Sequence, residues 1–199
     1  MEEKNLQNEI DFIKKIMNDS RVVIVDDGKD FIFWGIIVTI GLVLTYIAIV
    51  TGWAEYDIFV WLTLVAVGWA FSILRHFKAG SKRRASSLAG KMLGGIWAST
   101  GIASTIFGFV GPIAGAYHPA MISPMISMVL GCAFFTSGII YGKKWLSGLA
   151  AGWWTGAIFI FFFPYAYSLL VMAGMMLFLQ ITPGIILFRK SKAQFLKEI

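Results

Sequence analysis

The chain has 199 residues, of which 58% are hydrophobic and only 14% are charged, whereas soluble domains are roughly 45–50% apolar and about 25% charged. This composition excludes an ordinary soluble domain and predicts that lipid surrounds most of the chain. The single cysteine, Cys132, excludes an internal disulfide and a CxxC redox or zinc site.

Residues 1–30 precede the first long apolar stretch and carry an amphipathic pattern. Leu6, Ile10, Ile13 and Met17 recur at positions i, i+4, i+7 and i+11, with charged and polar residues between them. This spacing places the four apolar side chains on one face of a helix. We expect a cytoplasmic helix that packs on the membrane or on the rest of the protein, or that binds a cytoplasmic protein partner.

Six apolar stretches follow, each long enough to cross a hydrocarbon core of roughly 30 Å. They predict an all-α polytopic membrane protein with a six-helix transmembrane domain over residues 31–188 and a cytoplasmic tail over residues 189–199. The expected helices cover residues 31–50, 58–74, 93–113, 120–140, 146–163 and 166–188.

The 17 Lys and Arg residues lie before the first expected helix, between helices two and three, between helices four and five, and after helix six. The other three connections contain only Glu55, Asp57 and His118 as ionisable residues. By the positive-inside rule, the basic segments and both termini are cytoplasmic, and the protein is expected in the cell membrane.

The net charge of +6 is interpreted as a topology signal and an attraction to anionic lipid, not as a nucleic-acid-binding surface. The densest basic run is Lys82, Arg83 and Arg84. Topology alone explains this run, and contact with lipid headgroups or with a protein partner is the alternative.

The six stretches also carry a faint repeat of three hairpins. Residues 137–144 (SGIIYGKK) match residues 183–190 (PGIILFRK), and helices three and five begin alike, with KMLGG at 91–95 and KWLSG at 144–148. Because each unit has two helices, the repeats are parallel and not inverted. This layout, with Pro112 and Pro164 at or near the outer ends of helices three and five, resembles that of the small HdeD-type bacterial membrane proteins. The resemblance is one of spacing and assigns no functional residue.

Helix three is rich in small residues, which let helix backbones approach closely in lipid. The set includes Gly94, Ser99, Gly101, Ser104, Thr105 and Gly108. We expect helix three to be central in the bundle. Its small polar face is interpreted either as tight helix packing or as the path of a small solute.

Soft-metal ligand types follow one stripe of helix four. They are His118, Met121, Met125, Met128 and Cys132, at offsets of 0, 3, 7, 10 and 14. Met172 and Met176 on helix six repeat an MxxxM spacing, so a copper(I)-type thioether pathway is one interpretation. Methionine as a filler of apolar gaps is the other.

No Asp, Glu, Lys or Arg falls inside an expected helix, and the chain has no HExxH or GxSxG motif. We therefore expect neither an enzyme nor a cofactor. A lipid- or quinone-directed enzyme would have to use His76, His118, Glu55 or Asp57.

Two functional hypotheses rank above an enzyme. The first is a structural, sensory or regulatory membrane protein that presents its N-terminal helix and basic loop to a cytoplasmic partner. The second is a channel or facilitator for a small uncharged or soft solute. Homo-oligomerisation is compatible with both.

Overall fold

The computed structural model describes residues 28–78, 88–163 and 165–195, and all regular structure in these ranges is helical. The main helices are α2 (Lys29–Thr51), α3 (Asp57–Lys78), α4 (Leu88–Thr105), α6 (Ile122–Ile140), α7 (Lys144–Phe161) and α8 (Tyr165–Met175). Two of them continue without a break. α4 runs through the π-helical η2 (Ile106–Val110) into α5 (Gly111–Ile113), and α8 runs through the π-helical η4 (Met176–Ile181) into α9 (Thr182–Phe195). Short 3-10 turns, η1 (Ala54–Tyr56) and η3 (Pro119–Met121), precede α3 and α6. The all-α prediction is confirmed.

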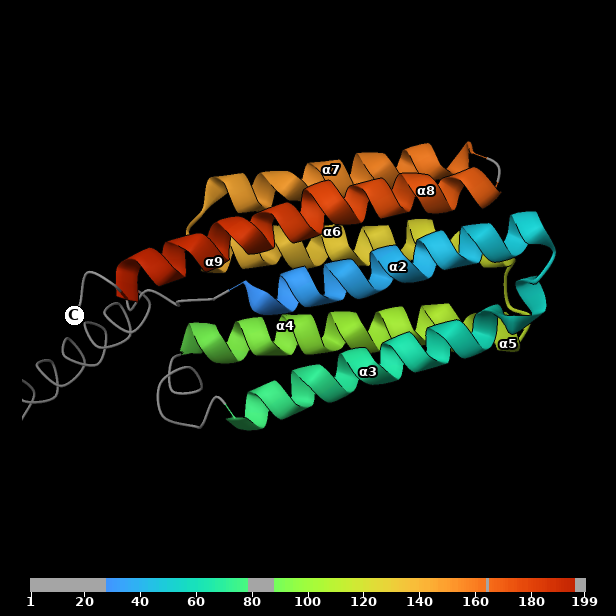
Figure 1. Cartoon of the computed structure of the whole chain (residues 1–199). Helices are drawn as coiled ribbons and strands as arrows, with labels where there is room; N and C mark the ends of the chain where they lie inside the picture. Colours follow the sequence, from blue (N-terminus) through green and yellow to red (C-terminus); the bar gives the residue numbers. More distant parts are fainter. Residues whose placement is uncertain (1–27, 79–87, 164, 196–199) are drawn as a thin grey trace, which may run out of the picture.

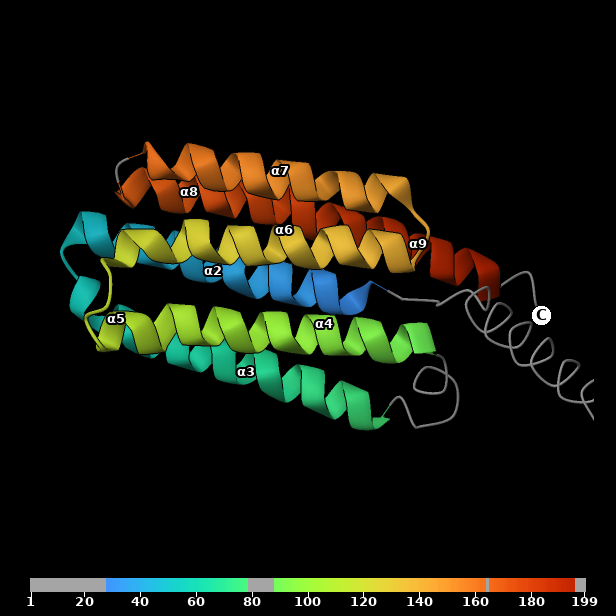
Figure 2. The same cartoon turned by 180° about the vertical axis from the view of Figure 1, so that it is seen from behind.

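Five of these helical rods are long and apolar enough to cross a membrane. They are Lys29–Thr51, Ala54–Phe77, Ala89–Ile113, Pro119–Ile140 and Tyr165–Ala193. The remaining rod, α7, has 18 residues and lies alongside the others (Figures 1 and 2). The described part of the chain therefore has the helix lengths and apolarity of a membrane protein.

Successive rods run in opposite directions along the bundle, so their ends gather at its two opposite ends (Figure 1). We call these the Asp30 end, where α2 begins, and the Asp57 end, where α3 begins. Every Lys and Arg of the described ranges lies at the Asp30 end. Glu55 and Asp57 are the acidic residues that the described ranges place at the Asp57 end.

Glycines in the left-handed conformation end three of the rods, at Gly52, Gly115 and Gly142, and the first and last illustrate the geometry. Gly52 follows α2 with φ 80°, and Gly142 follows α6 with φ 63°. In both turns the next residue donates its N–H back to a helix carbonyl, Trp53 to Ala48 and Lys143 to Gly138. This is the Schellman arrangement, in which glycine avoids the clash that a Cβ would cause.

The rods follow one another around the bundle. α4 packs on α6, α6 on α7, α7 on α8, the α8–α9 rod on α2, and α2 on α3. Aromatic rings fill the centre near the Asp30 end, where Phe31 and Phe134 have centroids 5.5 Å apart, with Trp97 and Trp153 on either side. Phe134 and Trp153 are fully buried, so packed side chains and not a channel occupy this part of the bundle.

Each π-helical turn lies just ahead of a proline. η2 precedes Pro112 and η4 precedes Pro183, as expected where proline removes a backbone donor and a carbonyl must find another partner. Tyr117 donates its hydroxyl to the Phe107 carbonyl at 2.7 Å, and Thr182 donates to the Leu177 carbonyl at 3.0 Å. The Tyr117 hydroxyl thus replaces the N–H that Pro112 lacks, whereas the Thr182 hydroxyl adds to the backbone N–H that Thr182 already donates to the Leu177 carbonyl.

The prediction that helix three is central was wrong. The rod over Ala89–Ile113 has 11% of its most apolar stretch buried, against 50% for the rod that contains α6. A Cβ added at Gly94 or Gly108 would meet no atom within 4 Å. These small residues lie on a face that no described helix covers, so small residues alone do not identify the centre of the bundle.

The closest helix pair in the bundle is α6 and α7. These helices belong to different units of the predicted repeat, since they correspond to helices four and five. A Cβ at Gly138 of α6 would run into the backbone of Ser147 on α7. The three-hairpin repeat itself stays a prediction.

Candidate functional site

Two contacts, here called tryptophan joints, hold α3 against α2. In each joint a tryptophan ring packs on a glycine of the other helix and its indole N–H donates to a hydroxyl of that helix. At the joint nearer the Asp57 end, the Trp61 ring of α3 lies across Gly41 of α2, where a Cβ would approach the ring to 2.8 Å. The Trp61 indole N–H donates to the Thr45 hydroxyl at 2.8 Å. The glycine admits the ring and the hydroxyl one turn later receives its N–H, so both parts of the indole are accommodated in an apolar setting.

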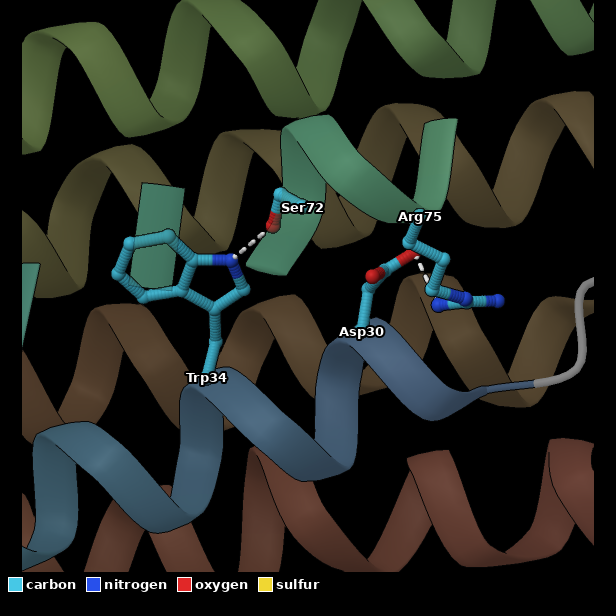
Figure 3. A network of polar contacts seen from close by, with 4 residues as sticks. All are labelled: Asp30, Trp34, Ser72 and Arg75. Atoms are coloured by element: carbon cyan, nitrogen blue, oxygen red, sulfur yellow. Dashed lines mark hydrogen bonds and ion pairs between the residues drawn. The ribbon is translucent and has the colours of Figure 1, made fainter. Parts of the chain in front are cut away.

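The joint nearer the Asp30 end has the same parts with the helices exchanged. The Trp34 ring of α2 lies across Gly68 of α3, where a Cβ would approach it to 2.5 Å. Trp34 donates its indole N–H to the Ser72 hydroxyl at 2.9 Å (Figure 3). The α2–α3 pair is therefore built with approximate two-fold symmetry.

The symmetry arises from a repeated sequence motif, Asp-x3-Trp-x6-Gly-x3-Thr/Ser, which occurs at residues 30–45 on α2 and again at residues 57–72 on α3. Sequence reasoning missed this repeat because it compared helix ends and small-residue spacings. A search for matched polar and aromatic positions 27 residues apart would have found it. Each helix supplies the tryptophan of one joint and the glycine and hydroxyl of the other.

The aspartate that opens each copy of the motif has a different partner at each end. At the Asp30 end, a carboxylate oxygen of Asp30 lies 2.6 Å from the Arg75 guanidinium, whose side chain is 18% exposed (Figure 3). At the Asp57 end, the Asp57 carboxylate accepts a 2.6 Å hydrogen bond from Thr45. The Thr45 hydroxyl also lies 3.0 Å from the Gly41 carbonyl, and the shorter contact to the charged acceptor is the stronger one.

Both aspartates and Arg75 lie within helices in the structure. The sequence predicted helices at 31–50 and 58–74 that contained no charged residue, but α2 begins at Lys29 and α3 covers Asp57–Lys78. The charged residues at these helix ends make contacts between α2 and α3, Asp30 with Arg75 and Asp57 with Thr45.

A hollow of about 570 Å³ opens beside Asp57, between α2 and α3. The hollow is an open depression on the surface of the helix pair and not an enclosed cavity. Its wall consists of the apolar Leu44, Ile47, Ala48 and Val60, the aromatic Trp53 and Tyr56, and the polar Thr51 and Asp57. This hollow, together with Asp57 and its Thr45 and Trp61 partners, is the candidate functional site.

Two further side chains extend the polar cluster at the Asp57 end. Tyr165, the first residue of α8, is half-buried and lies near Asp57. The His118 ring stands perpendicular to the Tyr165 ring with centroids 6.0 Å apart. Asp57 therefore lies near the beginning of α8, and Tyr165 contacts the turn before α6 through the His118 ring.

The candidate path residues on α4 occupy different environments. Gly101 lies under the Trp69 ring of α3, and Trp69 donates to Thr105 at 3.3 Å. Gly94 and Ser99 are exposed, whereas Ser104 and Gly108 are half-buried. The structure therefore divides them between a helix joint and the uncovered face of α4.

A second hollow, of about 340 Å³, lies between α4 and α6 and brings Ser99 close to Cys132. Its polar wall also includes Thr100 and Thr136. Ser99 donates to the Ile96 carbonyl and Thr136 to the Cys132 carbonyl, so these hydroxyls are satisfied by their own helices. Their roles as a solute path stay predictions.

The soft-ligand stripe follows α6 as its spacing indicated. His118, Met121, Met128 and Cys132 are exposed and Met125 is half-buried. Within the described ranges no group of three or more His, Cys, Asp or Glu residues is placed to hold a metal ion. His118 accepts the Ala120 N–H at 3.2 Å, as a cap for the turn that precedes α6, and Met172 on α8 accepts from Ser127. The metal assignment stays a prediction.

The predicted partner-binding residues lie outside the described residues. They are Leu6, Ile10, Ile13, Met17, Lys82, Arg83 and Arg84. Comparison of the chain with protein-family models, curated proteins and solved structures gives no match. The resemblance in layout to HdeD-type proteins and the assembly into a homo-oligomer therefore stay expectations.

Proposed function

We propose that this chain is a sensory or regulatory membrane protein in which the α2–α3 pair connects a site at the Asp57 end with the segments that flank it at the Asp30 end. The observation that carries the proposal is the position of the hollow beside Asp57. It lies between the two helices whose other ends lead, along the sequence, to residues 1–27 and 79–87. These segments contain the amphipathic pattern and the basic run, the two features that favour a protein partner.

The way α3 is held supports a role as the moving element. Only 6% of its most apolar stretch is buried, the smallest share among the five candidate membrane spans. Much of its connection to the bundle consists of indole–hydroxyl joints and of the polar contacts of Asp57 and Arg75. A helix with little buried apolar area and discrete polar contacts can shift between alternative arrangements at low energetic cost.

In the proposed orientation, the Asp30 end faces the cytoplasm and the Asp57 end faces outward. The gathering of the described Lys and Arg residues at the Asp30 end supports this orientation. Alkaline phosphatase fused after Asp57 or after Tyr117 should be active, and fused after Lys82 it should be inactive. Activity at Lys82 would reverse the orientation and refute the proposed direction of sensing.

The sensory role predicts that a substitution at Asp57 changes the conformation of the segment that follows the far end of α3. We expect Asp57→Ala and Thr45→Val to alter the electron paramagnetic resonance line shape of a spin label at position 82, placed by Lys82→Cys in a Cys132→Ser background. Both substitutions remove the hydrogen bond between α2 and α3, so α3 changes its position relative to α2.

Glu55→Ala is the matched control for this experiment. Glu55 is an exposed acidic residue at the same end of the bundle, so its removal should leave the spectrum at position 82 unchanged. Circular dichroism establishes that each variant is folded. Identical spectra for wild type, Asp57→Ala and Thr45→Val would refute the sensory role.

A facilitator is the second candidate function, and the hollow between α4 and α6 favours it because that hollow gathers three hydroxyls and a thiol. It ranks second because aromatic side chains fill the bundle centre near the Asp30 end. Two of the hydroxyls are also bonded to their own helices, which leaves a transported solute few free polar partners.

A further inference from the structure

The approximate symmetry of α2 and α3 makes the two ends of the pair directly comparable. The motif places Ala48 of α2 where α3 has Arg75, because each lies three residues after the hydroxyl of its copy. Arg75 pairs with Asp30 at one end. At the other end Asp57 has Ala48 and the hollow in the corresponding place.

The apolar residues around these positions are also smaller at the Asp57 end than at the Asp30 end. Phe33 and Phe71 stack with their centroids 3.7 Å apart near the Asp30 end. The motif positions that correspond to them are Val60 and Leu44, both in the wall of the hollow. Two phenyl rings and a guanidinium side chain are thus replaced by smaller residues, which accounts for the open space beside Asp57.

The charges around the hollow favour a cation. Asp57 lines it, and no basic side chain of the described ranges forms an ion pair with Asp57. The three connections at this end contain no Lys or Arg in the sequence. Trp53 and Tyr56 stand in its wall with ring centroids 5.9 Å apart, and the faces of such rings attract cations.

We infer that the hollow beside Asp57 binds an organic cation, a guanidinium or ammonium group on an apolar body, in the place that the Arg75 side chain and the Phe33–Phe71 stack occupy at the other end. The carboxylate of Asp57 pairs with the cationic head. Leu44, Val60 and Ala48 contact the apolar body, and the aromatic wall covers the head from the outside. This inference rests on the proposed function and names the ligand class that the α2–α3 pair senses.

Benzylguanidine and its neutral isostere benzylurea test this binding. We expect calorimetric titration of the full chain in phosphatidylglycerol nanodiscs to show one benzylguanidine site per chain, after subtraction of empty nanodiscs. Benzylurea should bind weaker by about tenfold or more, because the charge pair with Asp57 is absent. Asp57→Asn, which keeps the shape of the side chain, should weaken benzylguanidine by a similar factor. Equal affinity for the two compounds, or an unchanged affinity in Asp57→Asn, would overturn the inference.

Ala48→Arg supplies the guanidinium from within the chain. We expect it to abolish benzylguanidine binding and to raise the melting temperature by roughly 2–4 °C over Ala48→Gln, a neutral control with a long side chain. This difference should disappear when Asp57→Asn is added to both variants. Undiminished binding in folded Ala48→Arg would overturn the inference.

The cation can come from the aqueous phase or from an amine headgroup of the bilayer. Added phosphatidylethanolamine that competes with benzylguanidine identifies the lipid source, and unchanged affinity identifies a soluble cation. The spin-label experiment at position 82 contains no ligand, so it tests the sensory role separately from the titration. If benzylguanidine binds as expected but Asp57→Ala and Thr45→Val leave the spectrum at position 82 unchanged, the sensory role is refuted and the binding site is not.

Discussion

Gly138→Val is expected to separate α6 from α7 and to cause the largest loss of stability of any single substitution considered for this bundle. A side chain at this position would collide with the Ser147 backbone, which cannot move aside by changing rotamer. Overpacking typically costs 1–3 kcal/mol, and more where no relaxation is available. We expect a loss of at least about 3 kcal/mol in the free energy of unfolding, measured by titrating the protein from mild detergent into dodecyl sulfate and following circular dichroism.

Gly94→Val is the matched control, because it makes the same chemical change in a helix where a Cβ meets no atom within 4 Å. Its effect on unfolding should stay within about 0.5 kcal/mol, as for other uncovered positions. If Gly94→Val destabilised the monomer as much as Gly138→Val, the packing of α6 on α7 would not be the cause of the loss.

Arg75→Ala is expected to release the Asp30 end of α3 from α2. The substitution leaves the Asp30 carboxylate, which is about half-exposed, without the guanidinium that lies 2.6 Å away. Loss of a charged partner at a partly buried site costs about 1–3 kcal/mol. Pulsed electron paramagnetic resonance between spin labels at the exposed Ile36 and Ile73 positions should show a longer and broader distance distribution than in the wild type.

The charge-exchanged double variant Asp30→Arg with Arg75→Asp keeps the pair and should restore most of the stability and the narrow distance distribution. Lys91→Ala removes an exposed basic residue from the same end of the bundle and should change neither quantity. Equal distance distributions in the wild type and in Arg75→Ala would mean that the Trp34 joint and the Phe33–Phe71 stack hold this end of α3 without the ion pair.

Helix positions could be predicted from the sequence, whereas helix neighbours could not. An apolar stretch of about 20 residues has one stable structure in lipid, because every backbone group must be satisfied within the helix. All faces of such a helix are apolar, so no polar stripe indicates which face meets another helix. For this reason the small residues of α4 predict a central helix, although Gly94 and Gly108 lie on an uncovered face.

The candidate site was only partly visible in the sequence. The sequence shows Asp57 as one of few ionisable residues at its end, but predicts it in a loop. Its hydrogen bond with Thr45, twelve positions away, depends on α3 folding back against α2. The repeated Asp-x3-Trp-x6-Gly-x3-Thr/Ser pattern is present in the sequence, yet nothing in one helix shows that each copy completes the joint of the other.

The sequence by itself determined an all-helical chain of membrane-spanning length with its described basic residues at one end, because helix length and charge placement follow from local composition. Only the tertiary structure decided that α6 and α7 form the closest pair, that Arg75 neutralises Asp30, and that Asp57 faces an open hollow. These features depend on side-chain volumes meeting between antiparallel helices. Ala48 and Arg75 occupy corresponding positions of the motif, but only the packing of α2 against α3 places Arg75 beside Asp30 and leaves Asp57 beside the hollow.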